Sequence, residues 1–319
     1  SAAAPAAALS TGRKAKRKQI EKKIAVIMFN FRNDRSNPYS SEKLDNLLFN
    51  GSESLREYYL ENSYDILSVS GDVFGPYTIN KNNDRCDYRK WADAADDFVK
   101  NSRVDLNQYD YKMYVFPRTS ACEWGGLAML GGERSWINGQ REGAIASAGV
   151  FVHEFGHNLG VRHANHLNCD PRQVGRQCER IEYGELFDMM GNFHTFGGGH
   201  FNAPHKIYLD WIYDSKYQVI TRSGTHVLNP IESIDSPTQV LVVRRSGSGR
   251  RALSTYFVEY RTPTGFNFNF PDIVRGGVFI TSGGQKTDIF DSTPQSNEYG
   301  DVDDSALVDG ASFYDVDNG

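Results

Sequence analysis

The chain has 319 residues, 39% of them hydrophobic and 24% charged, which is the composition of a globular protein with one large or two ordinary domains. No apolar run approaches the roughly 18 residues of a membrane-spanning helix, so we expect no membrane span. The net charge is −5, but residues 13–23 alone carry +6, and the −11 carried by the rest argues against nucleic acid as a partner.

Residues 1–23 join a low-complexity start, SAAAPAAALSTG, to this basic run. They lack the charged start and apolar core of an intact signal peptide. We therefore predict a disordered basic linker or the remnant of a pro-segment over residues 1–23. The folded part is expected to begin at Ile24, where IAVIMFNF has the short apolar pattern of a buried strand.

The following segments alternate between helical and strand patterns. Ser54-Leu55-Arg56-Glu57 has the spacing of a capping box and predicts the start of a short helix. Residues 66–79 predict two strands around a turn at Gly75-Pro76. Apolar residues at helical spacing predict a helix over residues 87–102, and residues 111–116 predict a strand.

A glycine-rich segment, ACEWGGLAMLGGERSWING, occupies residues 121–139. One interpretation is a loop with an edge strand. The other is a strand that borders a substrate cleft, where an extended peptide would pair with exposed backbone groups. The two interpretations are compatible, and the sequence does not choose between them.

The motif HEFGHNLGVRH predicts a catalytic zinc site on a helix expected over residues 144–159. His153 and His157 are four residues apart and share one helix face. Gly160 can adopt a positive φ and turn the chain back, which brings His163 to the same metal ion. Three neutral imidazoles with one open position form a catalytic zinc site, whereas a structural site is closed by a fourth protein ligand.

Glu154 lies between the first two histidines, close enough to hold a water beside the metal ion and displaced from the position of a ligand. We predict that it is the general base. His166 is the main rival for third ligand, but its spacing fits less well. Tyr183, His194 and His200 also follow the motif and could reach the site, although we expect structural or surface roles for them.

The predicted secondary structure changes from helical to mainly strand patterns in the remainder of the chain. FNAPHKIYLDWI predicts a helix over residues 201–212, with a proline in its first turn. From about residue 217, strand-like runs alternate with turn clusters, which predicts a β-sandwich-like module. Aspartates gather near the C-terminus, where they indicate either a solvated acidic surface or, less well supported, a calcium site: Asp301, Asp303, Asp304, Asp309, Asp315 and Asp317.

The four cysteines contain no CxxC pair, which argues against a cysteine-based zinc site. They allow three disulfide pairings. We favour Cys169–Cys178, which closes a short loop, and this leaves Cys86–Cys122. The alternative is four reduced cysteines.

Further along, Asp188-Met189-Met190-Gly191 resembles a methionine turn, which together with HExxHxxGxxH is the metzincin signature. Met190, next to Gly191, fits the turn methionine better than Met189. Beyond the signature, the chain from about Ile24 to its end resembles the gametolysin (autolysin) family of metallopeptidases. The segments that carry this resemblance are CEWGGLAMLGGERSWING, HEFGHNLGVRHAN, YGELFDMMGN, FNAPHKIYLDW, YFVEYRTPTGF and KTDIFDSTP.

The resemblance implies a secreted zinc endopeptidase that acts on extracellular proteins or glycoproteins. It assigns the zinc ligands to His153, His157 and His163, the catalytic base to Glu154, and the turn methionine to Met190. Some members of the family have glutamine at the first histidine, but this chain keeps His153.

The expected fold is α+β: a metzincin-like catalytic domain over residues 24–215, with a twisted mixed sheet and a zinc-binding helix, then a β-rich module over residues 216–319. Two other functions stay open. One is a glycan-dependent glycoprotease of the mucinase kind. The other is a matrix- or glycan-binding protein with a passenger peptidase domain. The sequence predicts no oligomeric state.

Overall fold

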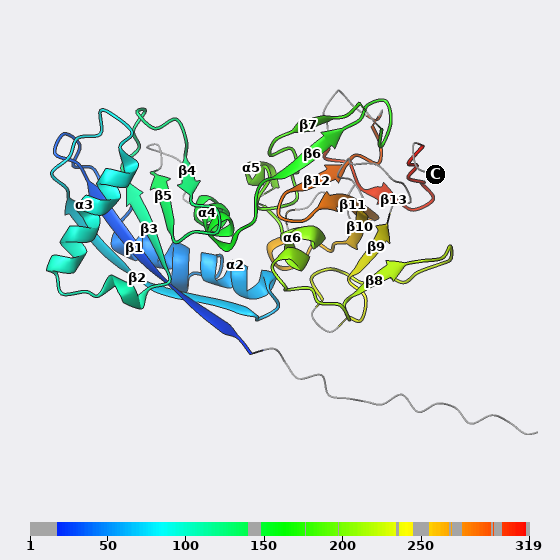
Figure 1. The fold of residues 1–319 in the computed structure, drawn as a ribbon, viewed down its shortest axis with the longest axis horizontal. Helices are drawn as coiled ribbons and strands as arrows, with labels where there is room; N and C mark the ends of the chain where they lie inside the picture. The colour runs from blue at the N-terminus through cyan, green and yellow to red at the C-terminus, as the bar shows by residue number, and fades with distance from the viewer. Residues whose placement is uncertain are drawn as a thin grey trace, which may run out of the picture.

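The computed structural model describes residues 18–139, 148–175, 177–196, 198–233, 236–244, 255–267, 269, 276–294, 296 and 302–316. It has an α+β fold in which two mixed sheets lie in the two halves of the molecule (Figure 1). The first sheet has the order β2-β1-β3-β5-β4, and only β4 runs antiparallel to its neighbour. Its strands are β1 (Ile20–Asn30), β2 (Leu67–Thr78), β3 (Tyr111–Phe116), β4 (Gly126–Ala128) and β5 (Arg134–Asn138).

The strand β1 is buried on both faces, which explains its unbroken apolar pattern. Alternate side chains point to opposite faces of a strand, so the run from Ile24 contributes to two separate cores. Ile24, Val26 and Met28 belong to one core, and Ala25, Ile27 and Phe29 belong to the other. The strand begins at Ile20, so the last lysines of the basic run are part of it, but burial begins at Ile24.

The helix α3 (Tyr88–Asn101) covers one of these faces with Trp91, Ala92, Ala95 and Val99. The other face packs against α1 (Ser41–Asp45), η1 (Asn46–Asn50), α2 (Leu55–Asn62) and α4 (Gly149–Leu159). A short turn, η2 (Leu106–Gln108), precedes β3.

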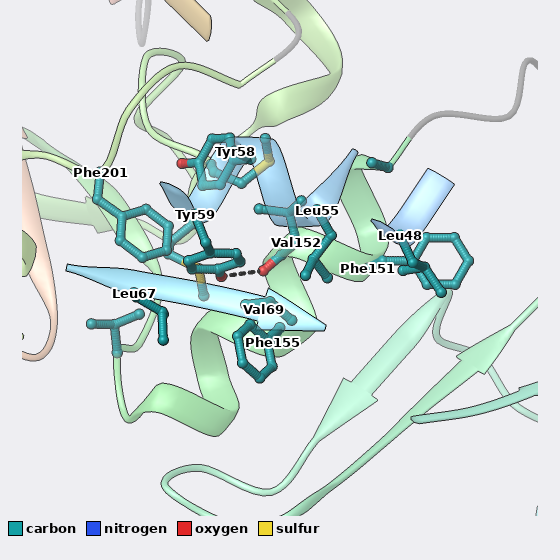
Figure 2. Packing of buried hydrophobic residues seen from close by; sticks show 14 of the residues in the cluster. Leu48, Leu55, Tyr58, Tyr59, Leu67, Val69, Phe151, Val152, Phe155 and Phe201 are labelled. Carbon is teal, nitrogen blue, oxygen red and sulfur yellow. Dashed lines mark hydrogen bonds between the residues drawn. The ribbon is translucent and has the colours of Figure 1, made fainter. Parts of the chain in front are cut away.

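Tyr59 of α2 joins this second core to the helix of the zinc motif. Its ring meets that of Phe155 edge-on at 5.0 Å between centroids, and its hydroxyl donates to the Val152 carbonyl at 2.7 Å (Figure 2). Ser54 caps α2 by accepting a hydrogen bond from the Glu57 amide at 3.3 Å, as the capping box predicts.

One prediction for this half needs correction. Leu67–Thr78 form one continuous strand, β2, because Gly75 adopts φ +102° and a shift of register against β1 absorbs the bend at Gly75-Pro76. The helix α4 is described from Gly149, and residues 144–147 of the predicted helix lie outside the described residues. So do residues 1–17 of the predicted linker.

The second sheet has the order β7-β6-β12-β11-β10-β9-β8, and β13 pairs with β11. The strands predicted after residue 217 are confirmed as part of this sheet. Its elements are β6 (Ala164–Asn168), β7 (Glu179–Ile181), β8 (Tyr217–Ile220), β9 (Val240–Arg244), β10 (Thr255–Tyr260), β11 (Gly277–Gly283), β12 (Thr287–Phe290) and β13 (Leu307–Val308). The short helices α5 (Phe193–Phe196) and α6 (Ala203–Tyr208) and the turn η3 (Gly265–Asn267) complete the described elements.

This sheet crosses the predicted domain boundary between residues 215 and 216. Strand β6, which directly follows His163, pairs in parallel with β12, so that Ala164 lies opposite Thr287. Only non-local pairing joins these segments, and no local pattern reveals it. A division at residue 215 therefore cuts through the second sheet and does not separate the two sheets. The domain boundary and the β-sandwich-like module both stay predictions.

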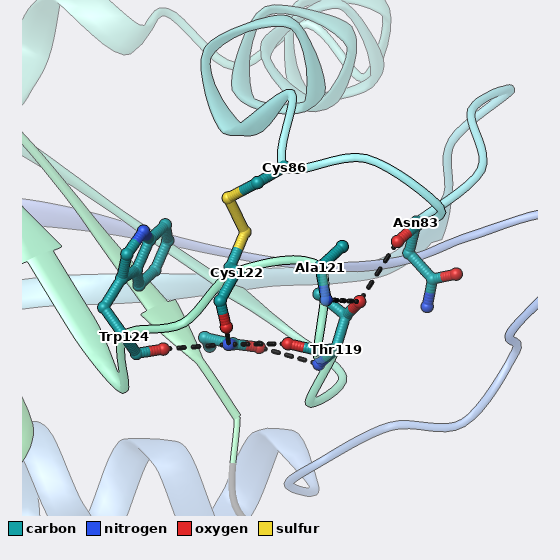
Figure 3. The surroundings of a disulfide bond; sticks show 7 residues. Asn83, Cys86, Thr119, Ala121, Cys122 and Trp124 are labelled. Carbon is teal, nitrogen blue, oxygen red and sulfur yellow. Dashed lines mark hydrogen bonds between the residues drawn. A yellow bond between two sulfur atoms is a disulfide. The ribbon is translucent and has the colours of Figure 1, made fainter.

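The two favoured disulfides are confirmed. Cys86–Cys122 ties the start of α3 to the segment after β3, beside Thr119 and Trp124 (Figure 3). Cys169–Cys178 closes the loop between β6 and β7. Within the described residues, no helix combines the length and apolarity needed to cross a bilayer.

Candidate metal site

The helix α4 and the turn after it gather three histidines. His153 and His157 lie on one face, with ring centroids 4.8 Å apart. Gly160 ends the helix with φ +105°, and the Val161 amide donates back to the Gly156 carbonyl at 3.2 Å. This reversal places the His163 ring 4.9 Å from that of His157.

The nitrogen atoms of the three histidines fit one metal ion. One ligand atom from each lies within 4.8 Å of the others, and in the described part of the chain this is the only such group of histidine, cysteine or acidic residues. The Nε2 atoms of His157 and His163 are 3.1 Å apart. Two nitrogens at about 2.0 Å from one tetrahedral zinc ion lie roughly 3.3 Å apart, so little adjustment is needed.

Each of these histidines uses its other ring nitrogen, Nδ1, for a hydrogen bond. His153 bonds the Met189 carbonyl at 2.9 Å, His157 bonds the Val161 carbonyl at 2.9 Å, and His163 bonds Glu182 Oε1 at 2.7 Å. All three partners are acceptors, so Nδ1 carries the proton in each neutral ring. The Nε2 lone pairs are then directed toward the common point.

Burial also keeps these rings neutral. Desolvation lowers the pKa of His153 to about 3 and that of His157 to about 4. A metal ion binds only unprotonated imidazole, so the site does not have to release protons near neutral pH before binding one.

Glu154 points into the same space. It is 5% exposed, and its Oε2 has no hydrogen-bond partner within the described chain. Burial raises its pKa to about 8. Gly126 of β4 faces it so closely that an added Cβ would lie 2.2 Å from Glu154 Oε1, so a larger residue there would displace the Glu154 side chain.

The site opens into a cavity of about 270 Å³. One wall is β4, which lies at the edge of the first sheet next to α4 (Figure 1). Tyr183 forms part of another wall, with its ring centroid 3.8 Å from that of His163. A larger cavity, about 460 Å³, lies between Pro171 and Val316 in the second half and contains none of the three histidines.

The segment expected to form a methionine turn lies under α4. Met190 is fully buried, and its sulfur occupies the space beside Gly156, where an added Cβ would lie 2.5 Å from it. Asp188 holds the turn by accepting hydrogen bonds from the Met190 amide at 2.6 Å and the Asn202 amide at 2.7 Å.

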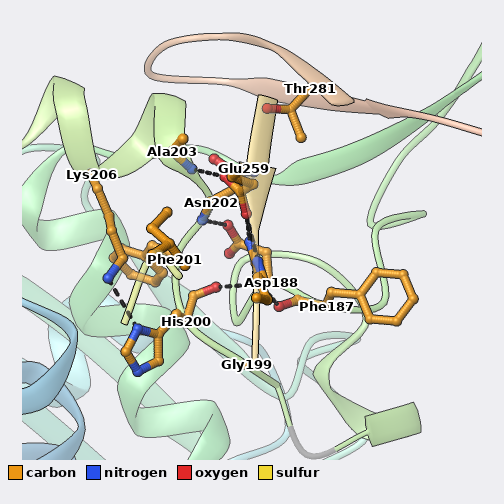
Figure 4. A network of polar contacts seen from close by, with 12 residues as sticks. Phe187, Asp188, Gly199, His200, Phe201, Asn202, Ala203, Lys206, Glu259 and Thr281 are labelled. Atoms are coloured by element: carbon orange, nitrogen blue, oxygen red, sulfur yellow. Dashed lines mark hydrogen bonds and ion pairs between the residues drawn. The ribbon is translucent and has the colours of Figure 1, made fainter. Parts of the chain in front are cut away.

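A buried arginine from the second half braces this turn, in the network of polar contacts that includes Asp188 and Glu259 (Figure 4). Arg261, which follows β10, donates to the Phe187 carbonyl at 2.5 Å and to the His200 carbonyl at 3.1 Å. Its guanidinium also pairs with Glu259 at 2.5 Å. Glu259 in turn accepts a hydrogen bond from the Ala203 amide at the start of α6.

The other candidates from the sequence have different places. His166 is buried in β6 and does not belong to the group of three. His200 is buried between Glu61 and Lys206, and His194 is exposed on α5. Tyr183 lines the cavity, whereas a structural or surface role was expected for it.

Sequence reasoning missed the contribution of three charged side chains near the site. Glu182 supports His163, and Arg162 and Lys286 line the cavity. Only the position of Arg162 inside the motif was a usable signal. Among the described C-terminal aspartates, no group of three ligating residues forms, so calcium gains no support.

Three histidines that share one point for a metal ion, with a buried glutamate beside them, place this α+β protein among those with a candidate metal site. The family model described as Gametolysin peptidase M11 matches residues 21–214, which is more than half of the chain. The chain therefore belongs to the gametolysin peptidase family, as the sequence resemblance predicted.

Other comparisons add little. The comparison with curated proteins gives no match. One solved structure, titled "Structure of a chaperone-substrate complex", matches with 16% identity and a TM-score of 0.28. The match covers 46% of this chain and 24% of the other, so this chain spans about a quarter of that protein, and the similarity carries no argument.

Proposed function

We propose that this gametolysin-family peptidase is a secreted, zinc-dependent endopeptidase of the metzincin type that cleaves extracellular proteins or glycoproteins. His153, His157 and His163 hold the zinc ion in this proposal. Glu154 is the general base, and Met190 is the turn methionine below the histidines.

The observation that carries the proposal is the shared orientation of the histidines. All three use Nδ1 for an acceptor and leave Nε2 for a common ion. The donor set consists of three neutral nitrogens, which suits zinc, and the buried Glu154 is not part of it.

Zinc bound there supplies a Lewis acid that polarises a peptide carbonyl and lowers the pKa of water toward about 7. Glu154 accepts the proton of the attacking water and passes it to the leaving amine. Burial raises the pKa of Glu154 in the metal-free site, and a zinc ion beside the carboxylate would oppose this shift and favour the unprotonated base. The edge of β4 would pair with an extended substrate, which places the scissile bond near Glu154.

Two disulfides support a place outside the cell, because such bonds persist in oxidising compartments. We keep the division into a catalytic domain over residues 24–215 and a C-terminal module over residues 216–319 as part of the proposal. The module would contribute to substrate choice.

The test compares the wild type with Glu154→Gln on a proteome-derived peptide mixture, and mass spectrometry of the fragments identifies the cleaved bonds. General-base catalysis contributes roughly 10²- to 10⁴-fold, so we expect a rate loss of at least this size with the zinc content unchanged. A chelator should abolish cleavage, and added zinc should restore it.

Glu133→Gln is the matched control, because Glu133 is exposed and does not line the cavity. Full activity of Glu154→Gln at full zinc content would refute the assigned base. Parallel assays with glycosylated and deglycosylated protein substrates test the glycan requirement. Cleavage only when the glycan is present would favour the glycoprotease, and binding without cleavage would favour the matrix-binding protein.

A further inference from the structure

Two exposed cations line the cavity beside the three histidines. Arg162 belongs to the turn after α4, and Lys286 belongs to the turn between β11 and β12. They are 124 positions apart in sequence. Of the two cations, Arg162 lies inside the segment that the family model matches and Lys286 lies outside it.

Backbone contacts fix the turn that carries Lys286. The Arg162 amide donates to the Gln285 carbonyl at 2.7 Å, and the Thr287 amide donates to the His163 carbonyl at 3.4 Å. Gly283 adopts φ +122°, and a Cβ there would lie 2.1 Å from the Lys286 carbonyl oxygen. The turn thus presents Lys286 to the cavity from a defined backbone.

Neither cation has a carboxylate at ion-pair distance in the part of the chain that the structure describes. The two nearby carboxylates are engaged elsewhere. Glu182 bonds His163 at 2.7 Å, and Asp288 bonds Arg180 at 2.6 and 2.7 Å. Arg162 Nε donates to the neutral Gln285 Oε1 at 3.2 Å, so the charges of Arg162 and Lys286 are not neutralised by an ion pair and are available to a substrate.

The cavity lining also includes the aliphatic side chains of Leu127, Ala128 and Leu130. A substrate side chain with methylene groups and a terminal carboxylate matches both the aliphatic and the cationic parts of this lining.

We propose that the peptidase prefers substrates with an acidic side chain, glutamate above all, next to the scissile bond, and that Arg162 and Lys286 determine this preference. This inference rests on the proposed endopeptidase function. It adds the substrate class to that function.

The test uses synthetic peptides built on one cleaved sequence, with Glu, Gln or Lys at each position flanking the scissile bond. At one of these positions we expect kcat/KM for Glu to exceed that for Gln by roughly 1.5- to fivefold, the range expected for exposed charge pairs. Raising the salt concentration should shrink this ratio, because screening weakens exposed charge pairs.

Lys286→Gln should lower the Glu/Gln ratio toward one, chiefly through KM for the Glu peptide, and Lys286→Glu should favour the Lys peptide. Lys286 is exposed, so neither variant should disturb folding. Arg222→Gln, an exposed cation beyond the far edge strand β8, should leave the ratio unchanged.

Equal cleavage of the Glu and Gln peptides by the wild type would overturn the preference, even if cleavage depends on Glu154. An unchanged ratio in both Lys286 variants would overturn the assigned residue. If no peptide is cleaved at all, the proposed endopeptidase function fails first.

Discussion

The choice of the third histidine depends on a turn of a few residues. Val161, Arg162 and His163 reverse the chain after Gly160, and His163 then faces the helix. His166 lies three residues further on, inside β6, where alternation along the strand places it away from the group. Spacing and backbone direction together therefore select His163.

We expect His163→Ala to weaken zinc binding strongly, because one of three ligands and its support from Glu182 are lost together. His166→Ala should retain close to one zinc ion per chain. Atomic emission measurements of zinc after dialysis against graded chelator would compare the two. Stronger zinc loss in His166→Ala would give the ligand role to His166.

At the residue scale, the sequence predicts the contacts that are set by short spacing. His153, His157 and the positive φ of Gly160 follow from the helix period and from glycine chemistry, and the structure brings them together with His163. Glu182 and Lys286 could not be predicted, because their places at the site depend on strand pairing: β6 with β7 for Glu182, and β6 with the remote β12 for Lys286.

At the scale of elements, the two disulfides close loops of very different length. Their sequence separations are 36 residues for Cys86–Cys122 and 9 residues for Cys169–Cys178. A cross-link restricts the unfolded chain more when its loop is longer. The first disulfide also ties α3 to the sheet that it covers, through the segment drawn in Figure 3.

The double variant Cys86→Ser/Cys122→Ser should lose about 4 kcal/mol of unfolding free energy, and Cys169→Ser/Cys178→Ser about 2.5 kcal/mol, in the chain-entropy model. Urea unfolding of the two variants beside the wild type measures both. A larger loss for the shorter loop would show that native packing around Cys169, and not chain entropy, dominates.

Strands and helices with strong local patterns were predictable, whereas their joining was not. The sequence predicted the buried part of β1, α3 and β3 because burial and amphipathic spacing leave a periodic pattern. The sequence predicted two strands in place of β2, because Gly75-Pro76 is a typical turn sequence although the strand pattern continues on both sides of it. The pairing of β6 with β12 leaves no periodic pattern in either strand.

At the scale of the whole molecule, the candidate site depends on both halves. Strand β6 continues from His163 into the second sheet, and Arg261 donates to the carbonyls of His200 and of Phe187, which directly precedes the proposed methionine turn. Arg261 and Glu259 are buried together, and removing one partner of such a pair costs about 3–5 kcal/mol. That is a large part of the roughly 5–15 kcal/mol that stabilises a typical domain.

A chain ended after Ser215 would lose β12 from the side of β6 and Arg261 from the turn, which leaves buried polar groups without partners. We therefore expect residues 18–215 alone to lack a cooperative urea transition and to bind zinc at least tenfold more weakly than the whole chain. Circular dichroism during urea titration and chelator competition measure these quantities, with the full chain prepared in parallel. A cooperative, zinc-binding fragment would show instead that the second half is a separable module, as the matrix-binding alternative requires.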